Sequence, residues 1–298
     1  MSRYWPMLLL LAGVWGASYL FIKVAVDEIE PAPMMAVRTL LAAAVLLVYV
    51  VWRFGRTRAG AELRAAWRHC LVLGIFNAAV PCWLIAWGEQ HIDSGLAAVV
   101  QASVPIFNAL LVLRFLPHER LTGTRALGLA IGIVGVAVVT GIHPNGGNLA
   151  ILGALAVVVS SLSYASAGVY GQRAVSGTAG PVLAAGSMLV GGLILTPFAL
   201  FQLPGSVPSL EATASVLALS LLGTALAQLI LRMLVLHGSA RLSLVTYLMP
   251  GFALIYGALI LDEELTFWTL GGLALILGGV ALASGAVRLR RRTAVAVP

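Results

Sequence analysis

Long apolar runs dominate the chain, and short polar or charged tracts separate them. Ten of these runs come close to the roughly 20 residues that a helix needs to cross the core of a bilayer. We predict transmembrane helices over Tyr4–Val26, Pro33–Trp52, Trp67–Gly88, Ser94–Leu116, Gly123–Gly141, Leu149–Gly171, Gly180–Leu203, Ala212–Leu236, Leu242–Leu261 and Phe267–Val287. The pattern therefore predicts an all-α membrane protein whose main partner is the lipid bilayer.

The composition agrees with a chain solvated by lipid. Only 10% of the 298 residues are charged, against about 25% in an ordinary soluble domain. The net charge of +7 does not indicate nucleic-acid binding, because the basic residues stand in short tracts between apolar runs. Two cysteines, Cys70 and Cys82, form no CxxC pair, so we expect neither a structural disulfide nor a zinc site.

Charge placement tests the number of crossings. If the N-terminus is cytoplasmic, every basic residue except Lys23 and Arg38 falls in a cytoplasmic segment or at the cytoplasmic end of a predicted helix. Every acidic residue except Glu62 and Glu119 then falls on the opposite side. Cytoplasmic loops of membrane proteins carry such an excess of Lys and Arg, and an error of one helix would scramble it. We predict ten crossings with both termini in the cytoplasm.

The two halves of the chain resemble each other. Gly95–Pro105 is similar to Ala240–Pro250, and each segment leads to an acidic step, at Glu119 or Glu263, followed by a glycine-rich helix. Because each half has an odd number of helices, the second copy should be inverted relative to the first, as in many secondary transporters. The predicted units are a first repeat over residues 1–145, an inverted second repeat over 146–287 and a basic cytoplasmic tail over 288–298.

These features resemble a known family. Trp15-Gly16-Ala17-Ser18 with Lys23, Pro33 with Arg38, and the paired Pro…Glu-x-Leu-Thr…Gly modules are similar to the EamA branch of the drug/metabolite transporter superfamily, most of all to its YddG-type amino-acid exporters. The resemblance implies ten helices in two inverted five-helix halves around a central cavity. It also implies efflux of amino acids or related metabolites across the bacterial inner membrane. The second half departs from the motif, with Tyr164-Ala165-Ser166 where the first has Trp15-Gly16-Ala17.

Three prolines near the middle of predicted helices are candidate hinges: Pro81, Pro105 and Pro250. Proline removes one backbone hydrogen bond and frees the carbonyl four residues before it. For Pro105 and Pro250 those carbonyls belong to Gln101 and Thr246, which are equivalent in the repeat. Such a group should face protein or a wet cavity, so it could meet a solute at a bending point, or a neighbouring helix could satisfy it in a fixed kink.

Polar and aromatic side chains inside the predicted helices are candidates for the wall of a solute cavity, because polar stripes should face the interior of a bundle. The candidates are Trp15, Ser18, Tyr19, Asn77, Trp87, Gln101, Asn108, Tyr164, Thr224, Gln228, Thr246 and Tyr247. Some of the amides could instead join helices to one another, and some aromatic residues could anchor helix ends at the interface.

Three charged residues are further candidates: Lys23, Arg38 and Glu89. A charge within a membrane helix is a functional candidate, and the two cations could attract a solute carboxylate. Alternatively they pair with Glu89, Asp27 or Glu28, or extend towards the interface. No acidic residue falls in the middle of a predicted helix, so we do not expect a carboxylate proton relay at the midplane.

The absent motifs narrow the function. The chain has no P-loop, no HExxH and no convergent nucleophile and base, so we expect no enzyme activity, no cofactor and no metal. Few basic residues lie within helices, which favours small zwitterions or neutral amphipaths over phosphorylated sugars. We predict a secondary transporter that exports small metabolites by alternating access. The alternatives are a carrier for a nucleoside, vitamin or cationic drug, and a non-transporting membrane subunit.

Overall fold

The computed structural model describes residues 4–115, 122–141, 147–175, 177–236 and 243–283, which form helices and short connections. The first half of the chain contains α1 (Tyr4–Val26), α2 (Pro31–Phe54), α3 (Arg56–Ala65), α4 (Trp67–Gly74), the π-helix η1 (Ile75–Ala79), α5 (Val80–Glu89), α6 (Ser94–Gln101), α7 (Val104–Phe115) and α8 (Gly123–Gly141). The second half contains α9 (Gly147–Ala174), α10 (Gly180–Phe201), α11 (Leu210–Ser220), the π-helix η2 (Leu221–Leu226), α12 (Ala227–Leu236), α13 (Ser243–Ile260) and α14 (Phe267–Ala283).

Every predicted membrane helix falls on one of these helices or on a consecutive group of them. Within the described residues, eight stretches are long and apolar enough to cross a membrane, and Leu244–Ile260 and Phe267–Ala283 are shorter apolar helices. Large apolar side chains on the outside, such as Phe201 and Phe267 with exposed fractions of 90% and 93%, fit contact with lipid rather than water. The count of ten crossings, the inverted repeat and the cytoplasmic termini stay predictions. The tail and the Glu119 step lie outside the described residues.

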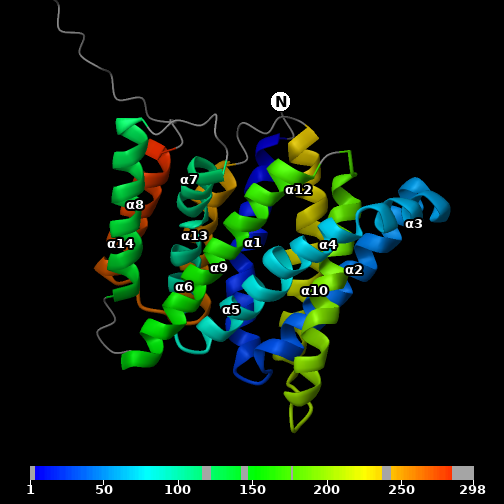
Figure 1. Ribbon diagram of the computed structural model, residues 1–298. Helices are drawn as coiled ribbons and strands as arrows, with labels where there is room; N and C mark the ends of the chain where they lie inside the picture. Colours follow the sequence, from blue (N-terminus) through cyan, green and yellow to red (C-terminus); the bar gives the residue numbers. More distant parts are fainter. Residues whose placement is uncertain (1–3, 116–121, 142–146, 176, 237–242, 284–298) are drawn as a thin grey trace, which may run out of the picture.

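Helices of the first half pack against helices of the second. Helix α2 lies along α10 at one side of the bundle and α8 along α14 at the other, while α1 contacts α13 and α5 contacts α9 between them (Figure 1). Helix α1 begins at the end of the bundle where α14 ends (Figure 1); we call this the N-terminal end. Helix α3, which the sequence pattern did not predict, projects from the side of the bundle next to α2 (Figure 1).

The contact between α8 and α14 joins two backbones through glycine. A Cβ atom on Gly279 would lie 2.5 Å from the nitrogen of Gly132 and 2.6 Å from the carbonyl oxygen of Gly128. Small residues allow membrane helices to approach this closely. The glycine pair of α8 therefore serves packing between the two halves.

Side chains of α9 donate hydrogen bonds to backbone carbonyl groups in the irregular segment around Pro81. Ser163 of α9 donates a hydrogen bond to the carbonyl oxygen of Phe76 at 2.9 Å, and Ser160 donates one to that of Pro81 at 3.1 Å. These contacts meet the requirement that buried backbone groups find partners in lipid. Pro105 lies at the start of α7, just after the break between α6 and α7, whereas Pro250 lies inside the continuous α13. Whether any of the three acts as a hinge stays a prediction.

Candidate functional site: a central cavity

A cavity of about 420 Å³ lies where helices of both halves meet. Nine of the twelve predicted cavity residues line it, namely Trp15, Ser18, Tyr19, Asn77, Gln101, Tyr164, Thr224, Gln228 and Thr246. Both π-helices contribute to its wall, with Asn77 from η1 and Thr224 from η2. This volume falls within the roughly 300–1,000 Å³ of typical small-molecule sites.

The wall combines aromatic faces with uncharged polar groups. Trp15, Tyr19 and Tyr164 supply rings, and the amides of Asn77 and Gln101 lie among them. The side-chain oxygen of Gln101 accepts a hydrogen bond of 3.3 Å from Ser161, which fixes the orientation of the amide. Such a wall can pack against an apolar group and also bind polar atoms of the same small molecule.

Arg38 is the single charged side chain among the described residues that line the cavity. Its Nε donates a hydrogen bond of 3.0 Å to the hydroxyl oxygen of Thr224, and its Nη1 lies 3.6 Å from the sulfur of Met35. In the described residues it forms no ion pair with a carboxylate. Thr224, in η2, itself donates to the backbone carbonyl oxygen of Leu219, in α11, at 2.9 Å. The π-helix of one half thus positions the cation of the other half at the cavity wall.

The three remaining candidates lie elsewhere. Asn108 lines a second cavity of about 280 Å³ together with Pro105. The break at residues 102–103 ends the helical register that would have placed Gln101, Pro105 and Asn108 on one face. Trp87 packs on His91 with ring centroids 4.7 Å apart.

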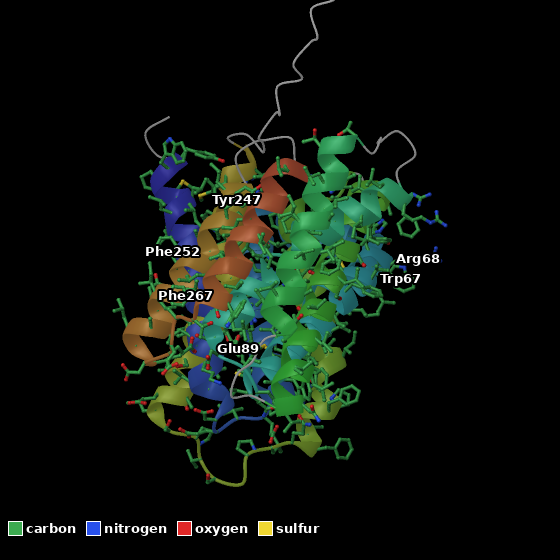
Figure 2. All side chains as sticks on the ribbon, turned by 90° about the vertical axis from the view of Figure 1, so that its left-hand side faces the viewer. Trp67, Arg68, Glu89, Tyr247, Phe252 and Phe267 are labelled. Atoms are coloured by element: carbon green, nitrogen blue, oxygen red, sulfur yellow. The ribbon has the colours of Figure 1, made fainter. Side chains whose placement is uncertain are left out.

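Trp87 and Tyr247 miss the cavity because each lies one or two residues along its helix from a residue that lines it. Trp87 is two residues beyond Ile85, hence about 200° around α5 from a residue that lines the cavity. Tyr247 is next to Thr246, hence about 100° around α13, and its ring packs against the buried core near the N-terminal end (Figure 2).

The ammonium group of Lys23 binds backbone carbonyl groups at the end of α5 and in the connection that follows it, and it does not bind a carboxylate. Its Nζ donates to the backbone carbonyl oxygens of Glu89 at 2.7 Å and Ile92 at 3.0 Å. The expected alternative of an ion pair with Glu89, Asp27 or Glu28 is not found in the described residues. Glu28, in the connection between α1 and α2, instead accepts hydrogen bonds from Ser209, which lower the pKa of its carboxyl group.

The charge pattern predicted Glu89 in a loop on the non-cytoplasmic side, and this prediction is wrong. Glu89 is the last residue of α5 and is completely buried, with an exposed fraction of 0%. Figure 2 shows it among the helices, in the half of the bundle away from the start of α1.

Glu263 joins the two halves at this same end. Its carboxylate accepts hydrogen bonds from the backbone N–H groups of Ser94 at 2.7 Å and Gly95 at 2.9 Å. These are the first residues of α6, where unpaired N–H groups and the helix dipole favour a negative charge. The carboxylate therefore fastens the connection between α13 and α14 to the start of α6.

We expect Glu263→Gln to lower the free energy of unfolding by about 2 kcal/mol, because hydrogen bonds to a charged acceptor are worth roughly 1.5–3 kcal/mol. Thermal unfolding of the purified protein in detergent measures the change. Glu264→Gln is the matched control, since Glu264 is the exposed neighbour. Equal melting temperatures for the two variants would show that the contact does not stabilise the fold.

Sequence reasoning missed part of the site. The contact between Arg38 and Thr224 joins residues 186 positions apart, and no local pattern indicates it. The apolar part of the wall, which includes Ile22, Ile85 and Met249, also has no sequence signal, because such residues fill all the helices. In the described residues no three His, Cys, Asp or Glu side chains gather closely enough to hold a metal ion.

The comparisons with known proteins agree on one family. The model of the EamA-like transporter family matches residues 3–141 and again residues 151–285. A protein of Archaeoglobus fulgidus named "Uncharacterized transporter" is 29% identical over 286 residues, covering 93% of this chain and 97% of that protein. "Uncharacterized inner membrane transporter YedA" of Escherichia coli is 32% identical over 224 residues, covering 72% of this chain and 68% of that protein.

A solved crystal structure shares the fold, with a TM-score of 0.68 and 19% identity, covering 97% of this chain and 99% of that one. The family match and the relatives named as transporters indicate a transporter rather than an enzyme. The chain belongs to the EamA-like transporter family and is a multi-pass membrane transporter.

Proposed function

We propose that the protein is a secondary carrier that exports amino acids, or similar small metabolites with a carboxylate, across the bacterial inner membrane. The observation that carries the proposal is Arg38, a cation at the cavity wall that forms no ion pair with a described carboxylate. An ion in a low-dielectric interior is costly unless it is paired. A solute carboxylate would supply the missing charge.

The rest of the cavity supports a neutral or aromatic amino acid. Rings of Trp15, Tyr19 and Tyr164 could pack on its side chain, and the oxygens of Asn77 and Gln101 could accept hydrogen bonds from its ammonium group. A cationic drug would be repelled by Arg38, and a neutral nucleoside or vitamin would leave it unpaired. A non-transporting subunit would have no need of a polar cavity between the halves.

We further propose that transport proceeds by alternating access, with the two halves rocking about the cavity. The irregular segments support this idea, because η1 and η2 occupy similar places in the two halves and both reach the cavity. The break between α6 and α7 and the proline of α13 are the candidate bending points.

Counterflow in liposomes containing the purified chain tests the proposal. Vesicles loaded with unlabelled L-phenylalanine should take up labelled L-phenylalanine faster than empty vesicles do. Parallel panels with L-methionine, uridine, thiamine and tetraphenylphosphonium separate an amino-acid carrier from the alternatives. Counterflow of uridine, thiamine or the organic cation without that of amino acids would reject the substrate class, and no counterflow of any solute would reject the carrier.

Removal of a wall residue should weaken transport without removing the fold. We expect Trp15→Ala or Gln101→Ala to lower L-phenylalanine counterflow about tenfold, since a buried ring or a polar contact contributes about 1–3 kcal/mol. The control is Trp52→Ala, because Trp52 lies on the outer surface with an exposed fraction of 78%. Unchanged counterflow in both wall variants would count against this cavity as the solute site.

A further inference from the structure

Glu89 is a buried acid whose two carboxylate oxygens find no hydrogen-bond partner among the residues that the structure describes. Both oxygens are shielded from solvent. Helices α5 and α9 approach each other closely just before Glu89, since a Cβ on Gly88 would lie 2.9 Å from the carbonyl oxygen of Gly153. An isolated ionised carboxylate is expensive in such a place, and binding a proton removes that expense.

The charges around Glu89 come from three other parts of the fold. Lys23 of α1 donates a hydrogen bond to the backbone carbonyl oxygen of Glu89 at 2.7 Å, and Arg38 of α2 lines the same cavity as Ile85, one turn before Glu89. The anion at this end is Glu263, before α14, which binds the start of α6. Tyr19 of α1 is a further titratable group, and it lies in the wall of the cavity. Other titratable groups in this region are Cys82 of α5 and Tyr164 of α9, whose Sγ and Oη atoms lie 3.6 Å apart. His91 forms a hydrogen bond from its Nδ1 to the backbone carbonyl oxygen of Trp87.

The same surroundings connect Glu89 to the cavity. Ile85, one helical turn before Glu89, lines the cavity, and so do Tyr19 and Ile22 beside Lys23. Arg38 and the turn of α5 that precedes Glu89 therefore line one and the same cavity. An ionised Glu89 competes with any carboxylate in the cavity for the charge of Arg38, whereas a protonated Glu89 does not.

We propose that Glu89 is a proton-binding site and that a proton on Glu89 and a carboxylate solute at Arg38 bind together and cross the membrane together. The proposal rests on the function proposed above, because the solute must carry a carboxylate. The linkage is reciprocal: the proton raises the affinity for the solute by the same factor by which the solute raises the affinity for the proton. No bond forms or breaks other than the O–H bond of the carboxyl group.

Two measurements test the proposal with the full chain. In the first, liposomes loaded with L-phenylalanine and a pH-sensitive dye are diluted into buffer without solute. Efflux should carry protons out and make the lumen alkaline, with about one proton for each molecule. In the second, equilibrium binding of labelled L-phenylalanine to the protein in detergent should weaken about tenfold from low to high pH, as Glu89 ionises.

The variant Glu89→Gln, which keeps a neutral side chain of similar shape, should bind L-phenylalanine with little dependence on pH and should show no lumen alkalinisation. Glu211→Gln is the matched control, because Glu211 lies exposed in the first turn of α11, and it should behave as the unmodified protein does. The binding readout stays informative even if Glu89→Gln transports poorly.

The outcomes separate this proposal from the proposed function. Counterflow of L-phenylalanine without any change in lumen pH overturns the proton site and leaves the amino-acid carrier intact. Acidification of the lumen during efflux overturns the joint binding, because it would show exchange of proton for solute. A pH dependence of binding that persists in Glu89→Gln overturns the assignment to Glu89. Absence of counterflow in the unmodified protein rejects the proposed function itself.

Discussion

Arg38→Gln should reduce L-phenylalanine transport about 100-fold, measured as the initial rate of counterflow at low solute concentration. The guanidinium is the single charged group among the described residues that line the cavity. Removal of one partner of a buried charge pair costs about 2–5 kcal/mol, and about 3 kcal/mol corresponds to a factor of 100 or more. The loss should lie in affinity, because the charge is present in every solute-bound state.

Two further variants sharpen this experiment. Arg38→Lys keeps the charge but loses the planar fork that can hold both Thr224 and a carboxylate, so we expect an intermediate loss of about tenfold. The matched control is Arg232→Gln, since Arg232 also lies in a membrane helix but bonds Tyr49 at 3.4 Å and does not line the cavity. A fully active Arg38→Gln protein would refute the assignment of Arg38 as the carboxylate anchor.

Gly279→Val should separate α14 from α8 and destabilise the protein by about 3 kcal/mol, the upper part of the range for overpacked cores. The added atoms would meet backbone atoms of Gly128 and Gly132 at 2.5–2.7 Å, and a backbone cannot move aside as a flexible side chain can. Thermal unfolding of the purified protein in detergent, monitored together with its elution as a single species, measures the effect.

The neighbouring glycine provides a control for this variant. A Cβ on Gly278 would meet nothing within 4 Å, so Gly278→Val has the same composition change and the same helix propensity. We expect the melting temperature of Gly278→Val to be close to that of the unmodified protein. If both variants melted alike, the close contact of α8 with α14 would not contribute to stability.

The helices could be predicted well because their signal is local. An apolar run of membrane length needs no knowledge of its neighbours, so predicted ranges such as Tyr4–Val26 and Gly123–Gly141 coincide with α1 and α8. Irregular segments were harder. The π-helix before Pro81 makes contacts with another helix, such as the hydrogen bond from Ser163 to the carbonyl oxygen of Phe76, and these contacts join residues that are distant in sequence.

The cavity could be predicted in type but not in detail. Polar side chains in a membrane helix should face inward, and this rule identified residues such as Asn77 and Gln228 that line the cavity. It also selected Asn108, because a continuous helix through Pro105 would place Asn108 on the same face as Gln101. The rule could not decide where the charges lie, since the placement of Arg38 and Glu89 depends on side chains from both halves.

The joint binding of a proton at Glu89 and a solute at Arg38, proposed above, would have an energetic consequence for the cell. A zwitterion that leaves with one proton carries one positive charge outward, against the membrane potential. At about 100 mV this costs about 2.3 kcal/mol, and a roughly 50-fold excess of internal solute balances it, since about 1.4 kcal/mol corresponds to a factor of ten. Such a carrier would export the solute only when its internal concentration exceeds this threshold, and it would retain the solute at lower concentrations.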